Sequence, residues 1–516
     1  MERNVSQLTQ VREEKILLVN PPFHRLYKDS YSEDMYPSGI GYLAGSIKTK
    51  TNWEVLVYNA DFVPNSDLLF SFKYELNTGF KNYLRSLGDL SISVWKEVQQ
   101  TIADYKPAVV GIYSSSASFA SARIVAKLAK SFSHKTLVVL GGPHSTAVGK
   151  DVLQDQNIDF AIRGEGELTV LELLKVISER GSVKKVKGIV YRAADEIVET
   201  PKADYITDLD ALVFPHKCAP EVLKDYEKYP KTAFRGILVS RGCPYNCFFC
   251  GSRDIMGRKL RLRSITNVLQ EIKSLQNLGL KYIQFLDDIF GADKEYTRQL
   301  CELLIRECPG ISWGCLMRVN LIDEQILVMV KKAGCRNIEI GIESGSNEML
   351  QKIRKGITIE EAIVATNLIR KNGIKLTANF VVGFPEETEQ TLNDTFNAMK
   401  KIKGRLNYSV FTPYPGTEAF AFCLEQGLIT EGFNVALYNH LSPENCFCLY
   451  FSKERFRELA SKIEKFADKH NSRQNLSDIF SREAIDRRHD NETTKNMKNL
   501  FRAIKRLVIT SNRSID

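Results

Sequence analysis

Apolar runs of strand length alternate with helical patterns along most of this chain, and the alternation limits the folds that it can adopt. In the N-terminal third, five runs end in polar or glycine-rich residues: KILLVNPPF, WEVLVYNADF, AVVGIYSSSA, TLVVLGGPHS and DFAIRGEGE. Strands that are apolar throughout are typical of a parallel sheet with helices on both faces. We therefore predict an α/β protein that begins with a doubly wound parallel sheet, in which ligands bind beyond the carboxyl ends of the strands.

The next part of the chain repeats a strand and helix unit six times. Its apolar runs are AFRGILVS, YIQFLDD, SWGCLMRV, NIEIGIES, TANFVVGF and YSVFTPY. Six consecutive units predict a partial (β/α)6 barrel, with functional residues at the carboxyl ends of the strands. The predicted boundaries are residues 1–205 for the first domain, 206–228 for a linker, 229–425 for the barrel and 426–516 for a mainly helical region. Within the first domain we expect a helical insert at about residues 65–105 and a closing hairpin in VKGIVYRAADEIVET.

Composition and charge favour a cytosolic globular protein with reduced thiols. The polar N-terminus lacks the apolar core of a signal peptide, and no run approaches the ~18 apolar residues of a membrane span. The 516 residues include 11 cysteines, an odd number that argues against a disulfide framework. Much of the net charge of +9 comes from residues 452–516, so it predicts neither a nucleic-acid nor a lipid surface. In this tail, MKNLFRAIKRLVI is expected to pack one apolar face against the body of the protein.

Three cysteines, Cys243, Cys247 and Cys250, fall within eight residues directly after the first strand of the predicted barrel. A structural zinc ion takes four ligands, and the nearest other candidates, His216 and Cys218, lack the spacing of a zinc finger. A four-iron, four-sulfur cluster can instead be held by three thiolates, which leaves one iron open to a substrate. The spacing therefore predicts an iron–sulfur cluster.

The pattern CxxxCxΦC, here Cys243, Cys247, Phe249 and Cys250, resembles the signature of radical S-adenosylmethionine (SAM) enzymes. The resemblance implies that the open iron chelates the amino and carboxylate groups of SAM, and that reductive cleavage yields a 5′-deoxyadenosyl radical. It also implies SAM contacts at strand ends and in GFPEET, the latter near the adenine. The residues are Phe249, Asp287 (with its neighbour Asp288), Arg318, Glu343, Gly383 and Pro385. The Gly-Gly-Glu that the family usually carries near Asp287 is absent.

The first domain resembles the cobalamin-binding domain of cobalamin-dependent radical SAM enzymes, because NPP, GGPH and RGEGE follow successive strands. The resemblance implies cobalamin contacts at these strand ends. The residues are Asn20, Pro21, Ser115, Gly141, Gly142, Gly164 and Glu165. The motif Asp-x-His-x-x-Gly, whose histidine ligates cobalt in methionine synthase, is absent, so we expect no histidine below the corrin. His24 and His144 are expected to be ordinary loop residues.

The resemblance implies an oxygen-sensitive enzyme that methylates an unactivated carbon or phosphorus through methylcobalamin and the 5′-deoxyadenosyl radical. A radical oxidative cyclase of the tetrapyrrole type is the alternative within the family, and a cobalamin or redox sensor is the alternative outside catalysis. A methylthiotransferase is disfavoured because residues 1–217 contain no cysteine for a second cluster. Expected partners are a small-molecule or natural-product substrate and an electron donor such as flavodoxin or ferredoxin. No motif singles out a catalytic residue or the substrate.

The remaining cysteines mostly lie in apolar patterns and are expected to be core thiols. Cys446 and Cys448, in ENCFCLY, are the exception, since they could form a redox pair or contribute to a metal site.

Overall fold

The computed structural model describes residues 14–32, 35–64, 72–194, 196–438, 442 and 444–479. The first domain contains a seven-stranded sheet in the order β2-β1-β3-β4-β5-β6-β7, and its first five strands are parallel. The strands are β1 (Lys15–Asn20), β2 (Glu54–Asn59), β3 (Val109–Tyr113), β4 (Leu137–Gly141), β5 (Phe160–Ile162), β6 (Ile189–Ala193) and β7 (Glu196–Glu199). The antiparallel pair β6 and β7 is the predicted hairpin.

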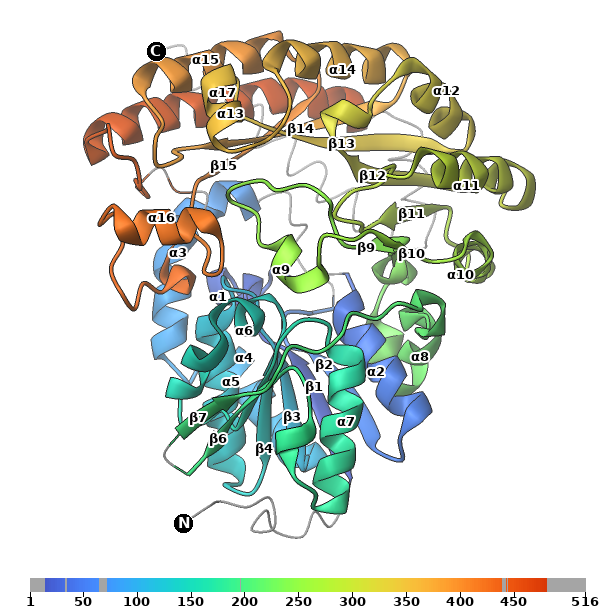
Figure 1. Ribbon diagram of the computed structural model, residues 1–516, viewed down its shortest axis with the longest axis vertical. Helices are drawn as coiled ribbons and strands as arrows, with labels where there is room; N and C mark the ends of the chain where they lie inside the picture. Colours follow the sequence, from blue (N-terminus) through green and yellow to red (C-terminus); the bar gives the residue numbers. More distant parts are fainter. Residues whose placement is uncertain are drawn as a thin grey trace.

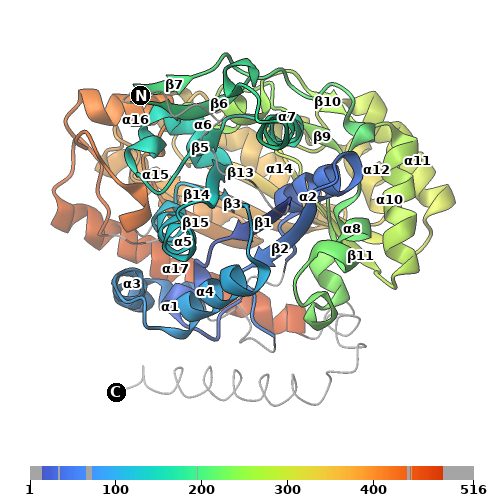
Figure 2. The same cartoon turned by 90° about the horizontal axis from the view of Figure 1, so that it is seen from below.

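Helices cover both faces of the first sheet, as Figure 2 shows. Alternate residues of β1 enter different cores: Ile16 and Leu18 pack on one side, Leu17 and Val19 on the other. One face carries α2 (Ser38–Lys50) and α7 (Gly166–Glu179), and the other carries α4 (Ser93–Tyr105) and α5 (Phe119–Phe132). The predicted helical insert corresponds to α3 (Phe72–Gly88) and α4. The doubly wound architecture is therefore confirmed.

The direction of the strand order changes at β1, because β2 and β3 lie on its opposite sides. In an open α/β sheet, the crevice at such a switch point is the usual place for a ligand. The segments after β1 and β3 begin at Pro21 and Ser114, so Asn20, Pro21 and Ser115 lie at this crevice. The other predicted cobalamin contacts lie at the ends of β4 and β5, further along the sheet.

The second domain contains a six-stranded parallel sheet in the order β15-β14-β13-β12-β11-β8. Its strands are β8 (Gly236–Ile237), β11 (Tyr282–Phe285), β12 (Ser312–Met317), β13 (Cys335–Glu343), β14 (Lys375–Val382) and β15 (Arg405–Val410). The six predicted strands are all present, and β8 and β15 form the two edges. Consecutive order with open edges is the arrangement expected of a partial barrel.

Local sequence signals start the helices that alternate with these strands. The helices are α10 (Ile265–Asn277), α11 (Lys294–Glu307), α12 (Glu324–Lys332), α14 (Ile359–Lys371) and α15 (Glu389–Lys401). In each of them the N-cap side chain accepts a backbone N–H of the first turn. These caps are Ser264, Asp293, Asp323, Thr358 and Thr388. Such oxygens satisfy donors that the helix leaves unpaired, so each helix begins at a defined residue after its strand.

The two domains are stacked with the carboxyl ends of the first sheet directed toward the barrel (Figure 1). The predicted linker contains α8 (Pro215–Val222), which packs against α2. At the C-terminal end, α17 (Lys453–Ile479) packs against β15. The predicted amphipathic stretch at residues 497–509 lies outside the described residues. No helix in the described part of the chain is both long and apolar enough to cross a membrane.

Candidate active site at the domain interface

The three cysteines lie in one loop that closes a short antiparallel hairpin. β9 (Ser240–Arg241) and β10 (Arg261–Leu262) pair, and residues 242–260, the cluster loop, connect them. Gly242 has a φ of +96°, and a Cβ there would overlap the carbonyl oxygen of Lys259, so only glycine fits. The Cys243 N–H donates to the Gly257 carbonyl oxygen at 3.1 Å. The loop is therefore folded back on itself near its base.

Two of the three cysteines are joined through the backbone, since the Cys250 N–H donates to the Cys247 carbonyl oxygen at 3.2 Å. Cys243, Cys247 and Cys250 are each half-buried. Burial raises the pKa of Cys243, the backbone of Tyr245 opposes this through a hydrogen bond, and the charges of Cys250, Asp288 and Cys247 raise the pKa further. Among the described residues, no three His, Cys, Asp or Glu side chains are arranged to hold a single metal ion. An iron–sulfur cluster binds its thiolates through separate irons, so three cysteines without a close fourth donor fit a cluster better than zinc.

Arg318 lies directly against the cluster loop. It follows β12, and its Nη1 donates to the Cys247 sulfur at 3.3 Å. Its guanidinium also stacks 3.7 Å from the ring centre of Tyr245, a loop residue. The second arm of the guanidinium donates to the carbonyl oxygen of Lys355. Arg318 is therefore fixed on three sides next to one of the predicted cluster ligands.

Glu343 is held in a strained position beside this arginine. Its φ is +73°, which is rare for a residue with a side chain, and the register of β13 shifts just before it. The ammonium of Lys355 donates to Glu343 Oε1 at 2.7 Å, and both side chains are nearly buried. A Cβ at Gly341 would overlap this carboxylate, so the glycine leaves room for the pair. Strain of this kind collects at functional sites. Sequence reasoning missed Lys355, which belongs to no motif and is identified only by its contact with a buried carboxylate.

The residues predicted around the adenine are brought together. The Phe249 ring lies 5.5 Å from that of Phe384, which stands between Gly383 and Pro385. The Gly383 N–H donates to the Glu387 carboxylate, and burial raises the pKa of Glu387 to about 8. The buried carboxyl group of Glu387 therefore fixes the backbone conformation of the segment that begins at Gly383.

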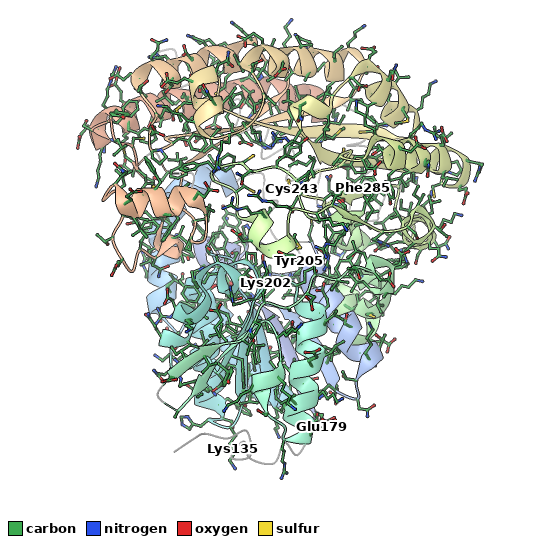
Figure 3. All side chains as sticks on the ribbon, in the orientation of Figure 1. Lys135, Glu179, Lys202, Tyr205, Cys243 and Phe285 are labelled. Atoms are coloured by element: carbon green, nitrogen blue, oxygen red, sulfur yellow. The ribbon has the colours of Figure 1, made fainter. Side chains whose placement is uncertain are left out.

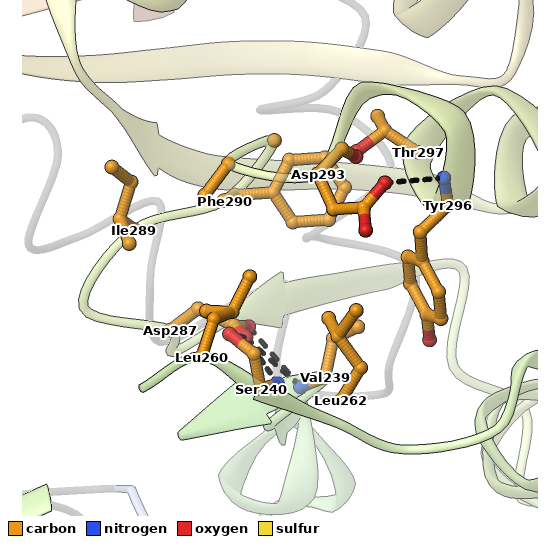
Figure 4. A pocket seen from close by; sticks show the side chains of 12 residues that line it. Val239, Ser240, Leu260, Leu262, Asp287, Ile289, Phe290, Asp293, Tyr296 and Thr297 are labelled. Atoms are coloured by element: carbon orange, nitrogen blue, oxygen red, sulfur yellow. Dashed lines mark hydrogen bonds between the residues drawn. The ribbon is translucent and has the colours of Figure 1, made fainter. Parts of the chain in front are cut away.

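Asp287 has a different environment from the one expected. Its carboxylate accepts hydrogen bonds from the backbone N–H groups of Val239 and Ser240, at 3.2 and 2.5 Å, and from the Ser240 hydroxyl at 2.6 Å (Figure 4). Complete burial raises the pKa of Asp287 to about 6, although these donors oppose the shift. The carboxylate thus anchors the backbone between β8 and β9. Its neighbour Asp288 is solvent-exposed, and the charge of Asp288 contributes to the raised pKa of Cys243.

The strand ends of the first domain present open backbone. We call the loop residues that follow β1, β3, β4 and β5 the first-domain rim. Gly164 has a φ of +79°, and a Cβ at Gly164 or Gly141 would meet no atom within 4 Å. Gly142 has a φ of +110° and approaches the Ser114 carbonyl oxygen so closely that a Cβ would lie 2.8 Å from it. Gly141 and Gly164 therefore leave room for a ligand to approach the main chain, whereas Gly142 allows a close approach between two segments of the protein itself.

Some polar side chains of the first-domain rim form hydrogen bonds with other residues of the first domain. The Asn20 amide donates to Asn59 Oδ1 at 2.9 Å, and the Ser115 and Ser118 hydroxyls lie 2.9 Å apart. Pro21, the next predicted contact, is buried after β1. These residues shape the edge of the crevice at the switch point.

The two rim histidines have protein partners. The Nδ1 of His24 shares a hydrogen bond of 2.5 Å with Asp61. The Nδ1 of His144 lies 3.0 Å from the Ser116 hydroxyl, and its ring lies 4.0 Å from that of Phe119. Burial lowers the pKa of His144 to about 4, so the imidazole is neutral at pH 7. Both histidines were expected in loops, but they lie in short helices, His24 in α1 (His24–Tyr27) and His144 in α6 (Pro143–Val148).

Glu165 turns away from the open part of the rim and joins the two domains. Its carboxylate accepts hydrogen bonds from Arg241 at 3.1 Å and from Arg261 at 2.7 Å, both in the cluster-loop hairpin. Sequence reasoning missed these arginines, because nothing in the local sequence indicates that they reach the other domain. Figure 3 shows Cys243 above Tyr205 and Lys202, at this boundary between the domains.

Two family models match the chain. The model described as "Radical SAM superfamily" matches residues 237–399, and the model described as "B12 binding domain" matches residues 25–174. "Uncharacterized methyltransferase PH0819" from Pyrococcus horikoshii is 29% identical over 452 residues, which cover 87% of this chain and 91% of that protein. The "anaerobic magnesium-protoporphyrin IX monomethyl ester cyclase" of Rubrivivax gelatinosus is 28% identical over 443 residues, 83% of this chain and 73% of that protein. The solved structure of TsrM, a radical SAM methyltransferase from Kitasatospora setae, shares the fold with a TM-score of 0.60 at 19% identity, over 80% of this chain and 75% of that one.

Proposed function

The chain belongs to the cobalamin-dependent radical SAM enzymes, and we propose that it is a methyltransferase acting on an unactivated carbon or phosphorus centre. Its cofactors are a [4Fe–4S] cluster, SAM and cobalamin. When bound, the cluster and SAM supply a carbon-centred radical, and cobalamin supplies a methyl carrier. The protein contributes by holding these groups, orienting them and excluding water.

On the barrel side, Cys243, Cys247 and Cys250 would hold the iron–sulfur cluster. Arg318 places a positive charge beside Cys247, within hydrogen-bond distance of its sulfur. Glu343, oriented by Lys355, offers its remaining carboxylate oxygen as an acceptor for a hydroxyl or ammonium of SAM.

The adenine of SAM would lie against Phe249 and the segment from Gly383 to Pro385, where the ring of Phe384 already meets that of Phe249. We place Asp288 rather than Asp287 near the methionine end, because Asp288 is exposed beside Cys243. Asp287 would have an indirect role, because it fixes the position of β9, the strand that leads into the cluster loop.

On the first-domain side, Asn20, Pro21, Ser115, Gly141, Gly142 and Gly164 would hold cobalamin. The open space at Gly141 and Gly164 is what a bulky planar ligand needs in order to reach the main chain. The rim and the cluster loop meet at the same domain interface, since Glu165 and Arg241 are in contact. A substrate between the domains would therefore face both cofactors.

The observation that carries methylation over the alternatives is the similarity to the Pyrococcus horikoshii protein, which extends over 91% of that protein's length and includes both domains. An oxidative cyclisation is the second candidate, because the Rubrivivax gelatinosus cyclase is similar at 28% identity. Both reactions use the same cofactor sites, so the products distinguish them.

The experiment uses the full chain, reconstituted anaerobically with iron, sulfide and hydroxocobalamin, reduced, and mixed with SAM. A methyltransferase is expected to form S-adenosylhomocysteine as well as 5′-deoxyadenosine. Formation of 5′-deoxyadenosine alone would favour the cyclase, and formation of neither would favour a sensor. In the control Cys247→Ala, 5′-deoxyadenosine should disappear because the cluster loses a ligand.

A further inference from the structure

Two arginines stand at the base of the cluster loop, where the hairpin closes. Arg241 and Arg261 are directly opposite each other in the antiparallel pair of β9 and β10, and they are only 6% and 8% exposed. Every cysteine of the cluster loop lies between them in the chain. Two cations this close in a protein interior repel each other unless carboxylates compensate them. The position of the carboxylates therefore fixes the base of the loop.

Both compensating carboxylates come from the first domain. Arg241 donates to Glu165 at 3.1 Å and to Glu167 at 2.5 Å. Arg261 donates to the other oxygen of Glu165 at 2.7 Å, and the backbone N–H of Ile206 donates to that same oxygen at 2.7 Å. All four charged side chains are buried, and their formal charges cancel. Moving one domain against the other would leave buried charges without partners, which is strongly unfavourable.

The glutamates also continue directly from the first-domain rim. Glu165 follows Gly164, the residue with open space above its Cα. On the barrel side, the Cys243 N–H donates to the Gly257 carbonyl, and Gly257 packs so closely on the Tyr205 ring that a Cβ would lie 2.9 Å from it. Direct contacts thus connect the rim to the cluster loop through the domain boundary.

We propose that Glu165, Glu167, Arg241 and Arg261, the interdomain ion network, are positioning residues that link cobalamin binding at the rim to assembly of the cluster loop. Linkage of this kind is reciprocal: if an assembled cluster favours the rim geometry that binds cobalamin, cobalamin favours the assembled loop by the same factor. The proposal rests on the cofactor sites proposed above. It does not depend on whether the reaction is methylation or cyclisation, so the two proposals fail separately.

The test compares the affinity of the full chain for hydroxocobalamin with and without a reconstituted iron–sulfur cluster, by absorbance titration under anaerobic conditions. We expect the wild-type protein to bind hydroxocobalamin about 5-fold more tightly, or better, when the cluster is present. Glu167→Gln removes one buried charge from the network and should bring the ratio close to 1. Equal affinities in the wild type, or an unchanged ratio in Glu167→Gln, would overturn the proposal.

The matched control is Glu271→Gln, which breaks a second buried pair. Arg263 donates to Glu271 at 2.5 Å, and both residues belong to the radical SAM domain. This variant should lower the melting temperature but keep the wild-type ratio, because the Arg263–Glu271 pair lies within the radical SAM domain, and the further contact of Glu271, with His216 at 3.8 Å, is to the linker. A ratio near 1 would make the linkage a general effect of destabilisation and overturn the proposal. Arg241→Lys keeps the charge but loses one of two contacts, so its ratio should lie between those of Glu167→Gln and the wild type.

A second measurement does not depend on affinity. The Mössbauer spectrum of the 57Fe-labelled cluster should change when hydroxocobalamin is added to the wild-type protein, and should stay unchanged in Glu167→Gln. The same response in both proteins would contradict a role for the interdomain ion network.

Discussion

Lys355→Met tests whether the buried pair at the end of β13 orders the SAM site. In the wild-type protein the Lys355 ammonium lies 2.7 Å from Glu343 Oε1, and the side chains are 8% and 11% exposed. Methionine keeps most of the volume but removes the charge. The backbone contact of residue 355 with Arg318 is unaffected, because it uses the carbonyl oxygen.

The expected cost follows from the burial of the carboxylate that remains. Removing one partner of a buried ion pair costs about 3–5 kcal/mol, because the other charge stays in the protein interior. For a domain of roughly 150–250 residues, 1 kcal/mol shifts the melting temperature by about 2–4 °C, so the barrel transition should fall by about 6–20 °C.

Scanning calorimetry of the iron-free protein at pH 7.5 measures this shift. Lys352→Met is the matched control, because Lys352 pairs with Glu348 at 3.0 Å on the surface and should contribute less than about 1 kcal/mol. The double variant Lys355→Met/Glu343→Met should recover most of the stability and still fail to bind SAM. A shift below about 2 °C in Lys355→Met, or a double variant that binds SAM normally, would refute the reasoning.

Three further outcomes follow from single residues. Iodoacetamide should alkylate Cys446 before Cys423, as measured by peptide mass mapping. A hydrogen bond from Cys448 lowers the pKa of the half-buried Cys446 to about 7, whereas burial raises the pKa of Cys423 to about 12. The free energy of unfolding of the iron-free protein, measured with urea, should fall by roughly 3 kcal/mol between about pH 4 and pH 6. Burial raises the pKa of Asp287 to about 6 in the folded protein, so in this range the folded state keeps a proton that the unfolded state releases. Asp287→Asn should flatten this pH dependence. Gly242→Ala should greatly reduce the iron bound per chain while leaving the far-ultraviolet circular dichroism unchanged, because the loop cannot close around a Cβ at this φ.

Features encoded locally were predictable from the sequence. The barrel strands were recognisable because each is an apolar run that alternates with a helical pattern, and both signals lie within one strand and helix unit. The spacing of the three cysteines is likewise contained in one loop. The buried core thiols, such as Cys301 and Cys315, were also expected from their apolar surroundings, and the structure confirms them.

The contacts that the sequence did not indicate depend on the side toward which a side chain points. Asp287 and Asp288 are adjacent after β11, and neighbouring residues of an extended chain point in opposite directions, so one is buried against β9 and the other is exposed at the cluster loop. At the rim, Gly164 has open space above its Cα, whereas the side chain of Glu165 reaches Arg241 of the other domain. Lys355 and Arg241 find their partners only after distant segments have packed. Such pairings are set by tertiary structure and leave no local pattern.

The central claim is that three thiolates from one loop hold an iron–sulfur cluster with one iron left open to SAM. The most direct measurement is the electron paramagnetic resonance spectrum of the anaerobically reconstituted, reduced protein, recorded before and after addition of SAM. We predict about four irons per chain, a cluster signal that changes when SAM binds, and loss of both in Cys247→Ala. A chain that binds zinc in place of iron, or a cluster signal that saturating SAM leaves unchanged, would contradict the account.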